Sequence, residues 1–101
     1  MRIKVELHRE VVHFVRHDAD EDEIKAFYEA LDRLAADPVA LIENSEPVRR
    51  PGMSRYMLRF FRFGRCIAIF ETNRARDGIR VRECQRIPPK RREAQGRGSD
   101  P

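Results

Sequence analysis

The hydrophobic positions in the first half of the chain follow two different periods. Ile3, Val5 and Leu7 alternate with charged residues, which predicts a β-strand over Met1–Leu7. Farther along, apolar residues recur every three or four positions, the spacing of one helix face, and this predicts a helix over residues 21–36. Its apolar stripe consists of Ile24, Phe27, Tyr28, Leu31, Leu34 and Ala35.

Capping residues mark the ends of the predicted helices. Asp20 stands three residues before Glu23, as in a capping box, and the Asp37-Pro38 pair ends the long helix. Because Asp caps helices and Pro fits the first helical position, we predict a further short helix over Pro38–Glu43. His8–His17 combines helical spacing with two adjacent valines, and we interpret it as a short helix rather than a strand.

The second half of the chain reads as a loop followed by three strands. Two prolines and a glycine predict a loop over Glu46–Ser54. Three apolar or alternating segments follow, joined by a turn at Gly64 and by a polar connection, Asn73–Gly78. The predicted strands are Arg55–Phe63, Arg65–Thr72 and Ile79–Cys84. These short connections predict an antiparallel meander.

The element order is strand, helix, helix, loop and three-stranded meander, which is typical of an α+β fold. We expect the helices to pack on one face of a four-stranded sheet, with the stripe of the long helix buried against Ile67, Ile69 or their neighbours. Residues 1–90 are predicted to form a single domain. Residues 91–101 lose the apolar pattern and are predicted to be a flexible basic C-terminal tail.

Charge divides the chain more clearly than its net value of +4 indicates. Residues 1–45 hold six Lys/Arg against eleven Asp/Glu, whereas residues 46–101 hold fifteen against six. Fourteen of those fifteen cations are Arg, whose guanidinium forms paired hydrogen bonds with phosphate and stacks on bases. The basic second half therefore predicts a polyanionic partner.

Several other classes are disfavoured. The longest apolar run, Cys66–Phe70, is far shorter than the roughly twenty residues that cross a bilayer, and no continuous apolar block marks a secretory signal. We expect a cytoplasmic protein with no membrane partner. Cys66 and Cys84 lack metal-ligand spacing and are interpreted as small buried hydrophobes. His13 and His17 are four apart but have no clear third ligand, so we expect neither a metal nor a cofactor.

Two segments carry a resemblance to a known family. The long helix ends in Leu-Ala-Ala-Asp-Pro (Leu34–Pro38), and the hairpin has the form Leu-Arg-Phe-Phe-Arg-Phe-Gly-Arg-Cys-Ile-Ala-Ile-Phe (Leu58–Phe70). With the chain length and element order, these segments resemble the RelE/ParE superfamily of type II toxins over about residues 1–87. The resemblance implies a RelE/ParE-like fold, growth inhibition and a cognate antitoxin as partner.

Members of this superfamily act on different targets. RelE-like toxins cut messenger RNA in the ribosomal A site, whereas ParE-like toxins inhibit DNA gyrase. We expect a ribosome-dependent, metal-independent endoribonuclease, because the fifteen cations of the second half suit ribosomal RNA and messenger at least as well as a protein target. The alternatives are a ParE-like gyrase inhibitor without catalytic activity and an inactive module that binds RNA or an antitoxin.

Cleavage of RNA without a metal needs a proton acceptor, an acid and cations that stabilise the phosphorane. Many RelE-like nucleases carry a Tyr or His near the end of the last strand. Residues 85–92 hold neither, so Glu83, Glu71 or a lysine would substitute. The predicted catalytic residues are Arg59, Arg65, Arg86 and Glu83. The predicted RNA-binding residues are Arg62, Lys90, Arg91, Arg92 and Tyr56.

Overall fold

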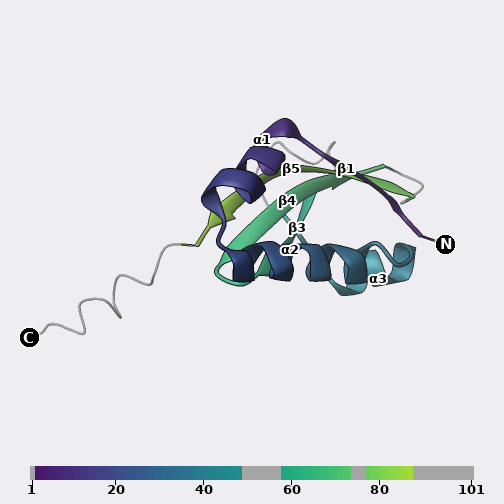
Figure 1. Cartoon of the computed structure of the whole chain (residues 1–101). Coiled ribbons are helices and arrows are strands. Elements are labelled where there is room, and N and C mark those ends of the chain that lie inside the picture. The colour runs from purple at the N-terminus through teal and green to yellow at the C-terminus, as the bar shows by residue number, and fades with distance from the viewer. Residues whose placement is uncertain (1, 49–57, 74–76, 88–101) are drawn as a thin grey trace, which may run out of the picture.

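The computed structural model describes residues 2–48, 58–73 and 77–87. Within these ranges, helices lie against a five-stranded sheet with the strand order β1-β5-β4-β3-β2 (Figure 1). The predicted α+β class is confirmed. The predictions for Tyr56, for Lys90, Arg91 and Arg92, and for the tail at 91–101 lie outside the described residues.

The helices form where the sequence predicts them, including the short helix that begins after His8. Asp20 and Glu23 make the predicted capping box, and Asp37 caps the next helix by accepting a hydrogen bond from the N–H of Ala40 at 2.7 Å. The bounds are Arg9–His13 for α1, Phe14–Asp18 for the π-helical turn η1, Glu21–Leu34 for α2 and Pro38–Glu43 for α3.

The predicted meander is confirmed, but the sheet formed by the described residues has five strands instead of the predicted four. The segment predicted as a loop, Glu46–Ser54, begins with a two-residue strand that pairs with β3, and such an edge position tolerates Pro47. β1 joins the opposite edge and runs parallel to β5. The strands are β1 Lys4–Leu7, β2 Glu46–Pro47, β3 Leu58–Phe63, β4 Cys66–Thr72 and β5 Gly78–Arg86.

The core lies between the helices and one face of the sheet. The ring of Phe27 is fully buried, with its centre 5.1 Å from that of Phe63 and 6.0 Å from that of Phe61. Leu31 and Leu34 are buried on the same helix stripe, as predicted. Buried residues of α1 and α3 belong to the same cluster, so the described helices all contribute to one core.

The face of β4 that meets the helices is not the predicted one. The register with β3 places Cys66, Ala68 and Phe70 on the core side. Ile67 and Ile69 therefore point to the opposite face of the sheet, which we call the open face. The helix stripe packs on their neighbours, as the prediction allowed, but the part of it that names Ile67 and Ile69 is wrong. Every residue in this run is apolar, so alternation along the sequence does not reveal which face lies inside.

Truncating the helix stripe tests this packing. Leu34 is completely buried, so Leu34→Ala is expected to lower the free energy of unfolding by about 2–5 kcal/mol, measured by urea denaturation. Val39→Ala is the control, because Val39 is 65% exposed and its loss should change stability by less than about 0.5 kcal/mol. Equal effects of the two substitutions would contradict the packing.

Candidate functional site

One charged cluster lies inside the fold and centres on Glu23. Its side chain is 11% exposed and accepts hydrogen bonds from Arg86 at 2.5 and 3.2 Å and from the Cys66 thiol at 3.3 Å. The backbone N–H of Asp20 donates to it at 3.0 Å. These donors, Arg86 foremost, stabilise the charged carboxylate and lower the pKa of Glu23 to about 2.

Arg86, one of the predicted catalytic residues, is therefore held by the fold. Its guanidinium also donates to the carbonyl of Asp18 at 3.1 Å and lies 5.7 Å from the centre of the Phe14 ring. The hydrogen bonds to Glu23 raise the pKa of Arg86. The side chain thus joins β5 to α2 and η1, which is a positioning role, and its catalytic role stays a prediction.

The two cysteines lie on neighbouring strands as free thiols. Cys66 is buried beside Glu23, and burial is the first cause that raises its thiol pKa to about 11. Burial likewise raises the pKa of Cys84, which is partly exposed, to about 12. Both side chains therefore stay protonated at neutral pH, in keeping with their interpretation as small hydrophobes.

Arg59 is held at a separate place on the core side. Its Nε donates to Ser45 Oγ at 2.7 Å and its Nη2 donates to the Ser45 carbonyl at 2.9 Å, so it ties β3 to the chain that leaves α3. Arg59 pairs with Phe70 and Arg86 pairs with Cys66, four residues away along β4. At about 3.3 Å per residue, roughly 13 Å separates these positions.

Arg62 and Arg65 are exposed at and near the β3–β4 turn. Gly64 makes this turn with a φ of 57°, and the carbonyl of Arg65 accepts a hydrogen bond from Ile87 at 2.7 Å. Arg62 lies on the open face, where its guanidinium is 5.7 Å from the centre of the Phe60 ring. Both arginines present their charge to solvent.

Glu83, the fourth predicted catalytic residue, lies on the open face opposite Ile69. The predicted catalytic set is thus divided between the core side, the turn and the open face. Arg59, Arg65, Arg86 and Glu83 are not brought together in one site.

A cavity of about 450 Å³ lies on the open face around Glu83. A register shift between Ile69 and Phe70 interrupts the β4–β5 ladder beside it, and such bulges redirect side chains. Its lining combines aliphatic residues with charged side chains and one histidine. The lining residues are His8, Glu10, Val48, Leu58, Ile69, Glu71, Arg80, Arg82 and Glu83.

Only Glu71 and Glu83 of these nine residues are candidates from the sequence; His8, Arg80 and Arg82 are among the seven that are not. His8 reaches the cavity because β1 pairs with β5, and its N–H donates to the Val81 carbonyl at 2.9 Å. No local pattern signals that pairing, since the two strands are far apart in the sequence. The two arginines flank Val81 in an alternating strand, and this alternation is the signal that predicts their exposure.

The charged groups of the cavity are only partly paired. Arg80 bonds to Glu6 at 3.3 Å, and Arg82 lies 3.5 Å from Glu71. Within residues 2–48, 58–73 and 77–87, the carboxylate of Glu83 has neither an ion pair nor a hydrogen bond. The Glu10 carboxylate is likewise without a partner among the described residues, so the cavity combines aliphatic side chains, guanidinium donors and carboxylate acceptors.

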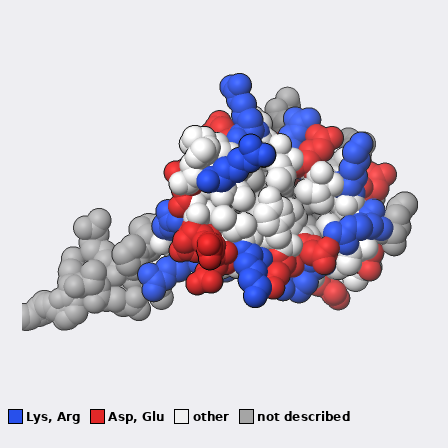
Figure 2. Space-filling view, in the orientation of Figure 1, with Lys and Arg blue, Asp and Glu red and all other residues white. Residues whose placement is uncertain are grey.

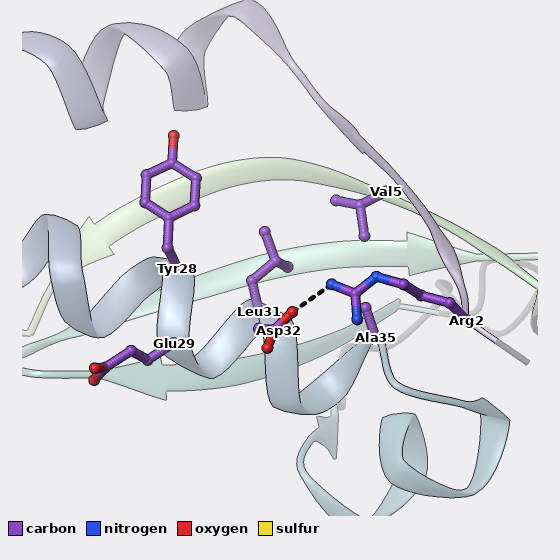
Figure 3. A pocket seen from close by; sticks show the side chains of 7 residues that line it. All are labelled: Arg2, Val5, Tyr28, Glu29, Leu31, Asp32 and Ala35. Atoms are coloured by element: carbon purple, nitrogen blue, oxygen red, sulfur yellow. Dashed lines mark hydrogen bonds and ion pairs between the residues drawn. The ribbon is translucent and has the colours of Figure 1, made fainter.

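A second cavity, of about 470 Å³, lies between β1 and α2. Val5, Leu31 and Tyr28 line it, and an ion pair joins Arg2 to Asp32 beside them (Figure 3). Figure 2 shows uncharged side chains gathered between α1 and α2, with acidic and basic side chains around them. The fold thus leaves an apolar hollow next to β1.

β1 is also an outer strand with an open edge. Lys4 and His8 donate their N–H groups to carbonyls of the β5 side at 2.9 Å, whereas Ile3 donates away from it, to Ala35. Because these directions alternate along a parallel strand, the backbone groups of Val5 and Leu7 face away from β5. Hydrogen-bonding groups and an apolar hollow therefore lie side by side.

The described residues contain no group of three His, Cys, Asp or Glu side chains that is arranged to hold a metal ion. His13 and His17 are exposed, with their ring centres 4.6 Å apart. Among the helices that the structure describes, none is long and apolar enough to cross a membrane.

The Glu23 cluster generates a prediction about acid stability. The folded-state pKa of about 2 lies below the ordinary value of 4.5, so this stabilisation is complete above about pH 4.5 and is lost as the pH falls toward 2. Glu23→Gln should flatten this part of the curve of melting temperature against pH. Glu29→Gln, at an exposed helix position, is the control and should retain the wild-type slope. Retention of that slope in Glu23→Gln would contradict the assignment.

The sequence matches no protein-family model and no curated protein. Solved structures do match. The archaeal RelE–RelB complex from Pyrococcus horikoshii OT3 aligns with a TM-score of 0.66 and 21% identity, covering 85% of this chain and 96% of the matched chain. The RelBE2 toxin–antitoxin complex from Mycobacterium tuberculosis aligns with a TM-score of 0.65 and 13% identity, covering 85% and 92%. These alignments show that the chain has the fold of the RelE toxins, as its resemblance implies.

Proposed function

We propose that this protein is the toxin of a type II toxin–antitoxin system and inhibits growth by cleaving messenger RNA on the ribosome. The observation that carries the proposal is the match in fold to RelE chains over nearly their whole length. Both matched structures are complexes of a toxin with its antitoxin, which supports an antitoxin as partner here.

The open face is the surface that suits RNA cleavage. In a metal-free reaction the 2′-oxygen attacks phosphorus, its proton passes to a base, and the 5′-oxygen leaves and takes up a proton from water. Three carboxylates line the cavity, Glu10, Glu71 and Glu83, and the two on the strands, Glu71 and Glu83, are the candidates to accept the first proton. Arg80 and Arg82 lie beside them and can stabilise the charge of the phosphorane.

The arginines predicted from sequence take different parts in this proposal. Arg62, on the open face, and Arg65, at the end of the hairpin, add positive charge to the surface along which RNA would lie. Arg59 and Arg86 act by holding α3 and α2 against the sheet. RNA contacts by Tyr56, Lys90, Arg91 and Arg92 remain predictions from the sequence.

The antitoxin is proposed to dock at β1. An extended segment of a partner can add a strand to the open edge, with main-chain hydrogen bonds to Val5 and Leu7. The apolar hollow beside Val5, Tyr28 and Leu31 would then receive one of its side chains. The charges of Arg2 and Asp32 offer partners of either sign at the rim.

Cleavage tests the open-face site. Arg82→Ala should lower the rate of cutting of messenger on programmed ribosomes by about a hundredfold, because one preorganised donor to a charged transition state is lost. Primer extension measures the rate. Arg33→Ala, an exposed change on α2, is the control and should leave it unchanged. Inhibition of gyrase supercoiling without any cleavage would instead favour a gyrase inhibitor. If the chain neither cleaves messenger nor inhibits supercoiling, the inactive binding module is the remaining alternative.

Rescue of growth by the antitoxin tests the proposed docking surface at β1. Expression of the chain should arrest growth in its native host, and co-expression of the small acidic protein expected from the adjacent gene should relieve the arrest. Tyr28→Asp places a charge in the apolar hollow and should weaken binding of that protein roughly tenfold or more, as loss of an aromatic anchor does. Titration calorimetry measures the affinity, with Lys25→Asp, outside the hollow, as control. Unchanged affinity in Tyr28→Asp would place the antitoxin elsewhere.

A further inference from the structure

We propose that the open-face cavity binds a guanine base, with Glu83 as the group that reads it. The inference deepens the proposed function, since RNA on the open face would present its bases to this cavity. It is carried by the Glu83 carboxylate, which has no partner among the described residues, and by the guanidinium groups and aliphatic side chains that line the same cavity.

The aliphatic part of the lining suits a flat, partly apolar ligand. Val48, Leu58 and Ile69 bring aliphatic side chains from three segments to one cavity, and Leu58 and Ile69 are only 8% and 6% exposed. A volume of about 450 Å³ accommodates one nucleotide-sized group. An apolar body with polar edges is therefore the expected occupant.

Glu83 determines which polar edge is required. An ionised carboxylate only accepts hydrogen bonds, and this one receives none from the described residues. A carboxylate that is covered by a ligand and left without a hydrogen-bond donor weakens binding, so the ligand must supply N–H groups. Guanine presents two, N1–H and the exocyclic N2–H, side by side on one edge and thus matches both carboxylate oxygens.

The rest of the cavity supplies donors. Arg80 and Arg82 each keep guanidinium N–H groups beyond those used on Glu6 and Glu71. The Nδ1 of His8 accepts a hydrogen bond from the Glu10 N–H at 3.2 Å, which places the proton of the neutral ring on Nε2 as a further donor. Guanine meets such donors with its O6 and N7 acceptors.

The other candidates fit less well. Adenine and cytosine donate from a single amino nitrogen and uracil from a single ring N–H, so each offers one donor nitrogen to the two oxygens of Glu83. A lysine or arginine side chain from a protein partner would satisfy Glu83 but would face Arg80 and Arg82 with like charge. Guanine alone of these offers two adjacent N–H donors to Glu83 together with acceptors for the arginines.

This assignment gives different roles to Glu71 and Glu83, the two carboxylates that the strands bring to the cavity. If Glu83 holds the base, Glu71 is left as the proton acceptor of cleavage, at 3.5 Å from Arg82. Replacing Glu83 should then change which sequence is cut, whereas replacing a proton acceptor slows cutting at every sequence alike.

The direct test uses titration calorimetry to measure how tightly the full chain binds each of the four nucleoside monophosphates. The wild type should bind GMP roughly tenfold or more tightly than AMP, CMP or UMP, the scale of one good bidentate contact. Glu83→Gln keeps the shape but replaces one acceptor oxygen by a donor, and should bring the four affinities close together. Glu46→Gln, on the open face but outside the cavity, should keep the preference.

Equal affinities in the wild type, or a preference for GMP that survives Glu83→Gln, would overturn the inference. The source of the base is distinguished with single-stranded oligoadenylate that carries one guanine or none. A preference for the guanine-containing RNA supports a base within RNA, and a preference seen only with GMP assigns the cavity to a free nucleotide. Because binding is measured without ribosomes, loss of the GMP preference and absence of cleavage are separate results, and the second alone refutes the proposed nuclease.

Discussion

The carboxylate of Glu23 is the group on which the arrangement of helix and sheet depends. It caps α2, accepts from Arg86 at the end of β5 and accepts from Cys66 at the start of β4. A single mostly buried charge thus fixes the N-terminal end of the main helix over two central strands. Because a buried carboxylate is costly without donors, each of the three contacts keeps the others in place.

The second anchor works at the other end of the helical layer. Arg59 reaches from β3 to Ser45, just after α3, and brings the following residues alongside as β2. Both ends of the helical layer are thus attached to the sheet by contacts on the core side. Charged side chains on the open face are not needed to hold the helices in place. The open face can therefore carry groups such as Glu83 that have no partner among the described residues.

The sequence predicted what is local and could not predict what is distant. The helix stripe of Phe27 and Leu31, the capping box and the meander follow from spacing within a few residues. The face of Ile67 and Ile69 could not be predicted, because a fully apolar run has no alternation. The place of His8 also depends on a parallel pairing between the two most distant strands, and that pairing is a property of the whole fold.

The charged residues show the same difference between what the sequence predicts and what the fold determines. Nine of the fifteen cations in residues 46–101 lie outside the described residues, and two of the other six, Arg59 and Arg86, hold the fold together. The cavity itself sets Arg80 and Arg82 against three carboxylates. Such a balanced surface gains little from the release of counterions, so recognition there must depend on shape and on directed hydrogen bonds. A count of arginines therefore predicts the class of partner, whereas the fold separates the arginines that build the molecule from those that can meet a ligand.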